Sequence, residues 1–306
     1  MFQRSSVALV VFALIWAGGP RPSAAADGPR WGGDYVPNVA VIAQDGRSLR
    51  FRDDAVRGKI IVLSFIYTAC SNICPLVTAR LSQLQDSLRD VLGRSVFFVS
   101  VSIDPVNDTP EKLAAFAAAF RTDPSWLFLT GDFADINVIR YKLGERTQAL
   151  TQHRNDILLF NDRTGDWQRA SAFDDIELLA LTVRSMDPQW RGAMGRGSET
   201  PDALAPEAPL GVLSHQPAGQ SLFLKLCASC HTVGLGPRIG PDLTGLLQRR
   251  DRRWAARYLA DPEALRAERD PTAIQLAESF APARMPTLGL SEGDIEDLMA
   301  FIETPK

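Results

Sequence analysis

Apolar runs of two kinds alternate along the first part of the chain, from about residue 36 to residue 186. Residues 59–67 form a continuous apolar run rich in β-branched side chains, which is typical of a strand covered on both faces. Residues 75–92 follow with apolar side chains at helical spacing. Further strands are expected at 39–43, 48–51, 95–103, 126–130 and 156–161, and further helices from Thr109 and over 174–183. Strands that alternate with helices predict an α/β domain.

The pattern changes after residue 187. Residues 188–214 are rich in Pro and Gly and carry no periodic apolar pattern, which predicts a flexible linker. From residue 215 to residue 306 the apolar spacing is helical, with no strand-like run. We therefore expect an α/β domain over 33–187 and an all-α domain over 215–306.

Residues 1–26 have the organisation of an export signal peptide. Arg4 precedes an apolar run at 7–17, and small residues at 24–26 provide a cleavage site. The run is shorter than the ~20 apolar residues of a membrane-spanning helix, although an uncleaved anchor is the alternative. Both interpretations predict a periplasmic protein, either free or attached to the cytoplasmic membrane.

Composition and charge narrow the function only slightly. The chain is 45% hydrophobic and 23% charged, as in globular proteins, and its net charge of −3 gives no electrostatic basis for nucleic-acid binding. The four cysteines form two close pairs, Cys70 with Cys74 and Cys227 with Cys230. A scaffold held by disulfides would carry many more cysteines. The two pairs are therefore the candidate sites of chemistry.

The second pair belongs to a Cys-Ala-Ser-Cys-His sequence, the C-x-x-C-H motif of covalent haem attachment. Cys227 and Cys230 would form thioethers with the haem vinyl groups, and His231 would bind the iron. A zinc half-site or a redox C-x-x-C pair is the alternative. A zinc site would need further Cys or His residues nearby, and none follows His231.

A second axial ligand and a support for His231 are also expected. Met285 lies in a loop before the last helix, whereas Met299 lies inside that helix, where a core role is usual; this favours Met285. Ligation by His and Met raises the iron potential. A ligating histidine commonly donates its other N–H to an acceptor, and the Pro241 carbonyl is our candidate.

Residues 215–306 resemble a class I cytochrome c. The matching stretches are 219–223 before the C-x-x-C-H motif, 240–245 after it, and 285–286 before a closing helix. The resemblance implies a domain that holds haem c and transfers electrons to or from a redox partner protein.

The first pair lies in Cys-Ser-Asn-Ile-Cys-Pro, directly after the run at 59–67. Three intervening residues place Cys70 and Cys74 on one face if the segment turns helically. A helix N-terminus lowers a thiol pKa, two soft thiolates suit Cu(I), and an added imidazole suits either copper state. His153 precedes the strand expected at 156–161, at the same strand end as the cysteines. A disulfide, buried free thiols or a surface histidine are the alternatives.

Residues 33–187 resemble the thioredoxin-like Sco/SenC family. The resemblance is carried by residues 65–68 before the cysteine pair, 104–111, 130–131, and His153 ahead of 156–162. It implies copper ligands at Cys70, Cys74 and His153, and a role in delivering copper to, or reducing thiols of, the dinuclear copper centre of cytochrome oxidase. The implied partners are the oxidase copper subunit or its assembly factors. Gln152 and Arg154 depart from the family pattern beside the histidine.

Three functions fit these motifs: a copper-binding assembly factor with a fused electron carrier, a thiol–disulfide oxidoreductase that passes electrons through its haem, and a pure electron-transfer protein. No proline lies between Pro124 and Pro188, where thioredoxin-type catalysts carry one opposite their cysteines, and His153 stands at about that place. Protein dithiol couples lie at about −270 to −120 mV, below a His/Met haem. The haem would therefore reduce a disulfide poorly, and copper is its better partner.

Overall fold

The computed structural model describes residues 35–71, 73–147, 149–152, 154, 156–190 and 218–304. The predicted signal peptide (1–26), almost all of the predicted linker (188–214) and His153 lie outside the described residues. In the part of the chain that is described, none of the helices combines the length and the apolar character that crossing a membrane requires.

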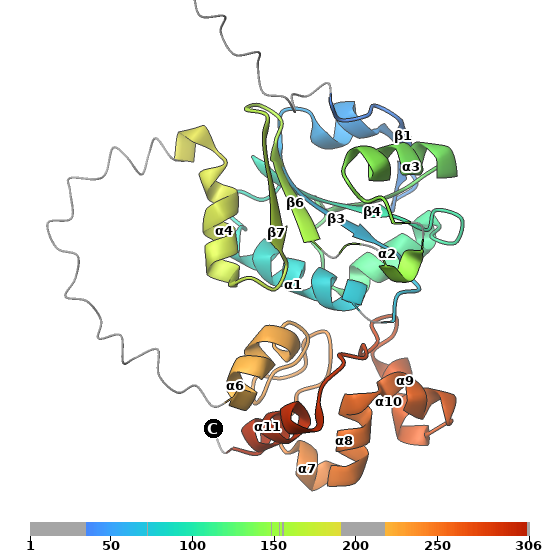
Figure 1. Ribbon diagram of the computed structural model, residues 1–306, viewed down its shortest axis with the longest axis vertical. Helices are drawn as coiled ribbons and strands as arrows, with labels where there is room; N and C mark the ends of the chain where they lie inside the picture. The colour runs from blue at the N-terminus through green and yellow to red at the C-terminus, as the bar shows by residue number, and fades with distance from the viewer. Residues whose placement is uncertain are drawn as a thin grey trace, which may run out of the picture.

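The first domain is built on a seven-stranded sheet in the order β2-β1-β5-β4-β3-β6-β7 (Figure 1). Strand β3 is parallel to β4 and antiparallel to β6, and β6 is antiparallel to β7. All residues of β3 are buried, which explains its continuous apolar run. The strands are β1 (Ala40–Ala43), β2 (Ser48–Arg50), β3 (Ile60–Ile66), β4 (Val96–Ser102), β5 (Leu127–Thr130), β6 (Asp156–Asn161) and β7 (Asp166–Ser171).

Helices cover both faces of the sheet. On one face, α1 (Ile73–Ser87), α2 (Pro110–Ala119) and α4 (Ile176–Ser185) share a core cluster with Ile60 and Val62 of β3. On the other face, a π-helical turn (Phe51–Val56) and α3 (Phe133–Lys142) share a second cluster with Ile61 and Leu63. The alternation of β3 side chains between two cores follows from the period of two of a strand. The β3-α1-β4 unit followed by the β6-β7 hairpin and α4 is a thioredoxin-like arrangement, and the predicted fold class is confirmed.

The described part of the second domain consists of helices and loops, as predicted. Helix α6 crosses α11 at Gly219, where an added Cβ would lie 1.9 Å from the Asp297 carbonyl oxygen, so only glycine permits this approach. Next to the crossing, the rings of Phe223 and Phe301 pack with centroids 5.2 Å apart. The elements are α6 (Ala218–Leu222), a π-helical turn (Phe223–Cys227), α7 (Leu246–Arg249), α8 (Arg252–Ala260), α9 (Pro262–Ala267), α10 (Pro271–Ser279) and α11 (Glu292–Glu303).

The predicted boundaries differ most at α1. We expected a helix over 75–92, but α1 ends at Ser87 and a turn follows. The apolar spacing continues past the helix because Leu88 and Leu92 still pack against the core from that turn. Helix α2 begins as expected, with Thr109 accepting a hydrogen bond from the Lys112 N–H at 3.4 Å. Helix α3 and strand β7 were not predicted.

Candidate functional site

The first cysteine pair lies where β3 turns into α1. Cys70 and Cys74 are both buried and free of disulfides. The Cys74 backbone N–H donates to Cys70 Sγ at 3.4 Å, and the two thiols share a hydrogen bond. The turn therefore brings both sulfurs together, as the spacing predicted.

The thiol pKa does not follow our expectation. The hydrogen bond to Cys70, together with burial, raises the pKa of Cys74. Burial and a hydrogen bond with Cys70 also raise the pKa of the Tyr67 hydroxyl. The prediction of a lowered thiol pKa is wrong for Cys74, because its hydrogen bond with Cys70 holds the thiol proton and burial disfavours the charged form. A bound soft cation would supply the compensating positive charge, since a coordinating thiol loses its proton.

A buried carboxylate supports the segment that leads into this pair. Asp108 is fully buried and accepts hydrogen bonds from the Thr68 N–H at 3.2 Å, the Thr68 hydroxyl at 2.5 Å and the Ser102 hydroxyl at 2.6 Å. Burial raises the pKa of Asp108. Thr68 lies two residues before Cys70, so Asp108 fixes the approach to the cysteine turn from the loop between β4 and α2.

The third predicted copper ligand, His153, lies outside the described residues. Its chain neighbour Arg154 donates its backbone N–H to the carboxylate of buried Glu145 at 2.7 Å. Leu158 of β6 pairs with Leu63 of β3 in antiparallel register, so β6 begins at the sheet edge where β3 ends. The described residues contain no group of three or more His, Cys, Asp or Glu side chains that could hold a metal ion. The complete ligand set stays a prediction.

The C-x-x-C-H motif follows the π-helical turn of the second domain. The N–H groups of Cys230 and His231 both donate to the Cys227 carbonyl, at 3.0 and 2.8 Å. This tight turn holds the three side chains in one segment. Burial raises the pKa of Cys227 to about 12 and that of Cys230 to about 11. Both are therefore protonated thiols at neutral pH, the form whose S–H adds to a vinyl group.

The His231 ring is oriented by the segment that follows. The Pro241 carbonyl oxygen lies 2.9 Å from His231 Nδ1, which is the contact we expected. A carbonyl can only accept, so Nδ1 carries the proton and Nε2 is left with a lone pair. Burial lowers the pKa of His231, which favours the neutral ring. Gly240 leaves room for the imidazole, since a Cβ there would lie 2.5 Å from His231 Cε1.

Two cavities meet at His231, with volumes of about 170 and 70 Å³. Cys227 lines the larger cavity and Cys230 the smaller one. The residues that line both are His231, Pro241, Tyr258, Leu276 and Met285. The predicted haem attachment residues therefore surround a mostly apolar space, and they fit a haem.

The structure separates the two methionine candidates. Met285 lines both cavities together with His231. Met299 lines neither of them and is buried in a cluster with Ala255, Leu259 and Ile295. This arrangement favours Met285 as the second axial ligand, as the loop position suggested.

Sequence reasoning gave no role to several residues that shape these sites. Asp108 lies in the segment 104–111 that carries the family resemblance, and its position directly before the helix expected from Thr109 was the available signal. Glu145 gave no such signal, because nothing in the sequence pattern shows that its carboxylate accepts the N–H of Arg154.

Comparisons with known proteins agree with the two domains. Residues 32–165 match the model of the SCO1/SenC family, and residues 217–306 match the model of the Cytochrome c family. The SCO1 protein homolog of Bacillus subtilis is 37% identical over 89 residues, which are 29% of this chain and 45% of that protein. The chain thus spans less than half the length of this relative.

Two solved structures are similar to the first domain. A SCO1/SenC family lipoprotein from Bacillus anthracis aligns with a TM-score of 0.43 and 26% identity, covering 51% of this chain and 94% of that one. Arabidopsis thaliana ScoI with copper bound aligns with a TM-score of 0.40 and 22% identity, covering 48% and 94%. The match of the second domain to Cytochrome c implies a covalently bound haem. The chain therefore joins a SCO1/SenC domain of thioredoxin-like fold to a C-terminal cytochrome c domain.

Proposed function

We propose that this protein is a copper-binding Sco-type factor for assembly of the copper centre of cytochrome c oxidase, with a fused haem that exchanges electrons with the copper site. The observation that carries the proposal is the pair of buried thiols, Cys70 and Cys74, which are hydrogen-bonded to each other and form no disulfide, in a SCO1/SenC domain. Two adjacent soft sulfurs suit Cu(I), and His153 would complete the ligand set for either copper state.

In the second domain, Cys227 and Cys230 would hold the haem covalently, and His231 and Met285 would ligate its iron. The bound haem supplies a one-electron couple. Copper also changes by one electron between its two states, whereas a dithiol gives up two. This match in electron count favours copper as the partner of the haem.

The proposed protein partners and the proposed location in the cell follow from the same functional assignment. The client is the copper subunit of the oxidase or one of its assembly factors, and a redox partner protein exchanges electrons with the haem. The signal-like residues 1–26 support export to the periplasm, with cleavage or with retention as an anchor in the cytoplasmic membrane.

An electron-exchange experiment tests this function. The full-length protein is reduced at its haem, loaded with Cu(II), and followed by the haem absorption bands. We expect the haem to be oxidised as copper is reduced, one electron for each copper, and at a rate independent of protein concentration. The double variant Cys70→Ser, Cys74→Ser should show no such phase. Unchanged bands in the wild type, with both centres shown to be intact, would contradict the proposal.

A thiol–disulfide oxidoreductase is the second candidate, because the contact between the Cys70 and Cys74 thiols is also suitable for a disulfide. The sequence opposes it, since no proline stands between Pro124 and Pro188, where thioredoxin-type catalysts carry one opposite their cysteines. Metal-free protein should therefore reduce oxidised glutathione no faster than a simple thiol of ordinary pKa. A rate well above that of such a thiol would favour the oxidoreductase.

A further inference from the structure

The two domains touch along one face of the first domain. Figure 1 shows the helical C-terminal domain beneath α1 and α2. The contact is made by the segment just after the C-x-x-C-H motif, which carries Arg238 and Ile239. The haem-binding segment of one domain therefore lies against the other domain.

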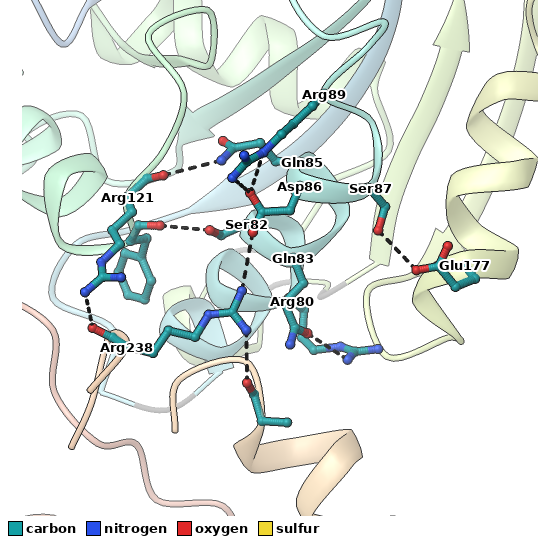
Figure 2. Close-up of polar contacts among 12 residues, drawn as sticks. Arg80, Ser82, Gln83, Gln85, Asp86, Ser87, Arg89, Arg121, Glu177 and Arg238 are labelled. Atoms are coloured by element: carbon teal, nitrogen blue, oxygen red, sulfur yellow. Dashed lines mark hydrogen bonds and ion pairs between the residues drawn. The ribbon is translucent and has the colours of Figure 1, made fainter. Parts of the chain in front are cut away.

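Arg238 joins the domains through both its backbone and its side chain (Figure 2). Its carbonyl oxygen accepts a hydrogen bond from Arg121 Nη2 at 2.7 Å. Its Nη2 lies 3.4 Å from Asp86 Oδ2, and its Nη1 donates to the Ala228 carbonyl at 3.4 Å. One residue thus connects the last turn of α1, the turn after α2 and the haem segment.

The backbone of Arg121 has an unusual conformation for its residue type. Its φ is +52°, in the left-handed region that favours glycine. It follows Phe120, the residue that caps α2, at a position where glycine commonly ends a helix. Arginine at this position makes a contact that glycine could not make, because its guanidinium donates a hydrogen bond to the other domain.

The centre of the contact is apolar. Ile239 and Ala283 of the second domain are only 8% and 9% exposed, and they belong to the core cluster that contains Phe116 and Phe120 of the first domain. Cys230 packs against the same cluster. Burial of apolar side chains provides the attraction that hydrogen bonds alone would not supply.

The haem space reaches across this boundary. The smaller of the two cavities, which is lined by Cys230, His231 and Met285, is also lined by Pro75 and Phe120 of the first domain. Pro75 directly follows Cys74.

We infer that the SCO1/SenC domain supplies a wall of the haem pocket through Pro75 and Phe120, and that Arg121, Arg238 and Ile239 hold this wall in place. The cysteine pair is then one residue from the haem space, and undocking exposes the haem to water.

Two variants test this inference in the full-length, haem-loaded, copper-free protein. Ile239→Glu places a charge in the apolar centre of the contact. Arg121→Gly removes the guanidinium and relieves the left-handed backbone, so the first domain stays folded. Arg269→Gly is the matched control, because Arg269 also has a left-handed φ of +60°, but it is exposed in the second domain.

The readouts are hydrogen exchange of the backbone amides at 117–122 and 228–231, and the midpoint potential of the haem. Ile239→Glu and Arg121→Gly should raise exchange several-fold in both segments and shift the midpoint potential, because water reaches the haem. Arg269→Gly should change neither. If Arg121→Gly leaves exchange unchanged, or raises exchange without moving the potential, the proposed wall is overturned. No copper is used, so the outcome is independent of the proposed copper function.

Discussion

Pro75 of the SCO1/SenC domain and His231 of the cytochrome c domain line the same cavity. Pro75 follows Cys74, the predicted copper ligand, and His231 is the predicted haem ligand. Two sites that the sequence places in separate domains are therefore neighbours in space. Changes at one site should be detectable at the other.

Replacement of the two methionines should separate their roles. Met285→Leu removes the only described methionine that lines both cavities with His231, so the spectrum of His/Met-ligated iron should be lost and the midpoint potential should fall. Met299→Leu is the matched control. It exchanges two apolar side chains of similar volume in a buried cluster, so the spectrum should be kept and stability should fall by less than about 1.5 kcal/mol. Loss of the spectrum in Met299→Leu alone would reverse the assignment.

Gly240→Ala should disturb the haem site without adding a charge or a polar group. The new Cβ would lie 2.5 Å from His231 Cε1, so the imidazole must move and its bond to the Pro241 carbonyl must weaken. We expect a lower haem potential or incomplete haem attachment, measured by redox titration and absorption. Gly293→Ala in α11 is the control, because its nearest neighbour would be 3.9 Å away. A Gly240→Ala protein with wild-type bands and potential would show that the glycine is not needed.

Asp108→Asn should weaken the support of the cysteine turn. The amide NH₂ cannot accept a hydrogen bond, so at least one of the donors from Thr68 and Ser102 loses its partner. We expect the free energy of unfolding to fall by about 1–3 kcal/mol and copper affinity to fall with it. Urea unfolding and competition with a Cu(I) chelator measure the two effects. Asp135→Asn, at the partly exposed start of α3, should change both very little.

The acid stability of the cytochrome c domain should depend on Asp242. Hydrogen bonds from the backbone N–H groups of Thr244 and Gly234 hold the pKa of this carboxyl well below its usual range. Because the folded pKa is lowered, the stability that Asp242 contributes is fully present above the unfolded pKa of about 3.9 and is lost as the pH falls below it.

Urea unfolding followed by the haem bands at several pH values checks this dependence. Asp242→Asn should be less stable than the wild type at pH 7, and the difference should shrink between about pH 5 and pH 2. A difference that stays constant over this range would exclude the proposed role of the charge.

Short-range signals explain why much of the fold could be predicted. The buried strand β3 appears as an apolar run, and the start of α2 appears as Thr109 followed by proline. Strand β7 was missed because it is a largely exposed edge strand without apolar alternation. Helix α3 was missed because only two of its apolar side chains, Ile136 and Ile139, face the core.

The candidate sites also contain features that short sequence segments predict and features that depend on contacts between distant residues. The C-x-x-C-H motif and the Pro241 carbonyl could be placed from spacing alone, because they lie within one short segment. The raised pKa of Cys74 could not be predicted from the sequence, because it depends on the hydrogen bond with the Cys70 thiol and on burial. The contact between Arg238 and Asp86 could not be predicted either, since it joins different domains and leaves no periodic pattern in the sequence.

Metal and haem analysis of the purified full-length protein tests the central claim most directly. The wild type should hold one haem and one copper per chain. Cys70→Ser and Cys74→Ser should each lose the copper and keep the haem, and His153→Ala should bind copper more weakly. The double variant Cys227→Ser, Cys230→Ser should lose the covalent haem and keep the copper. Copper bound equally by the wild type, Cys70→Ser and His153→Ala would contradict the copper site proposed here.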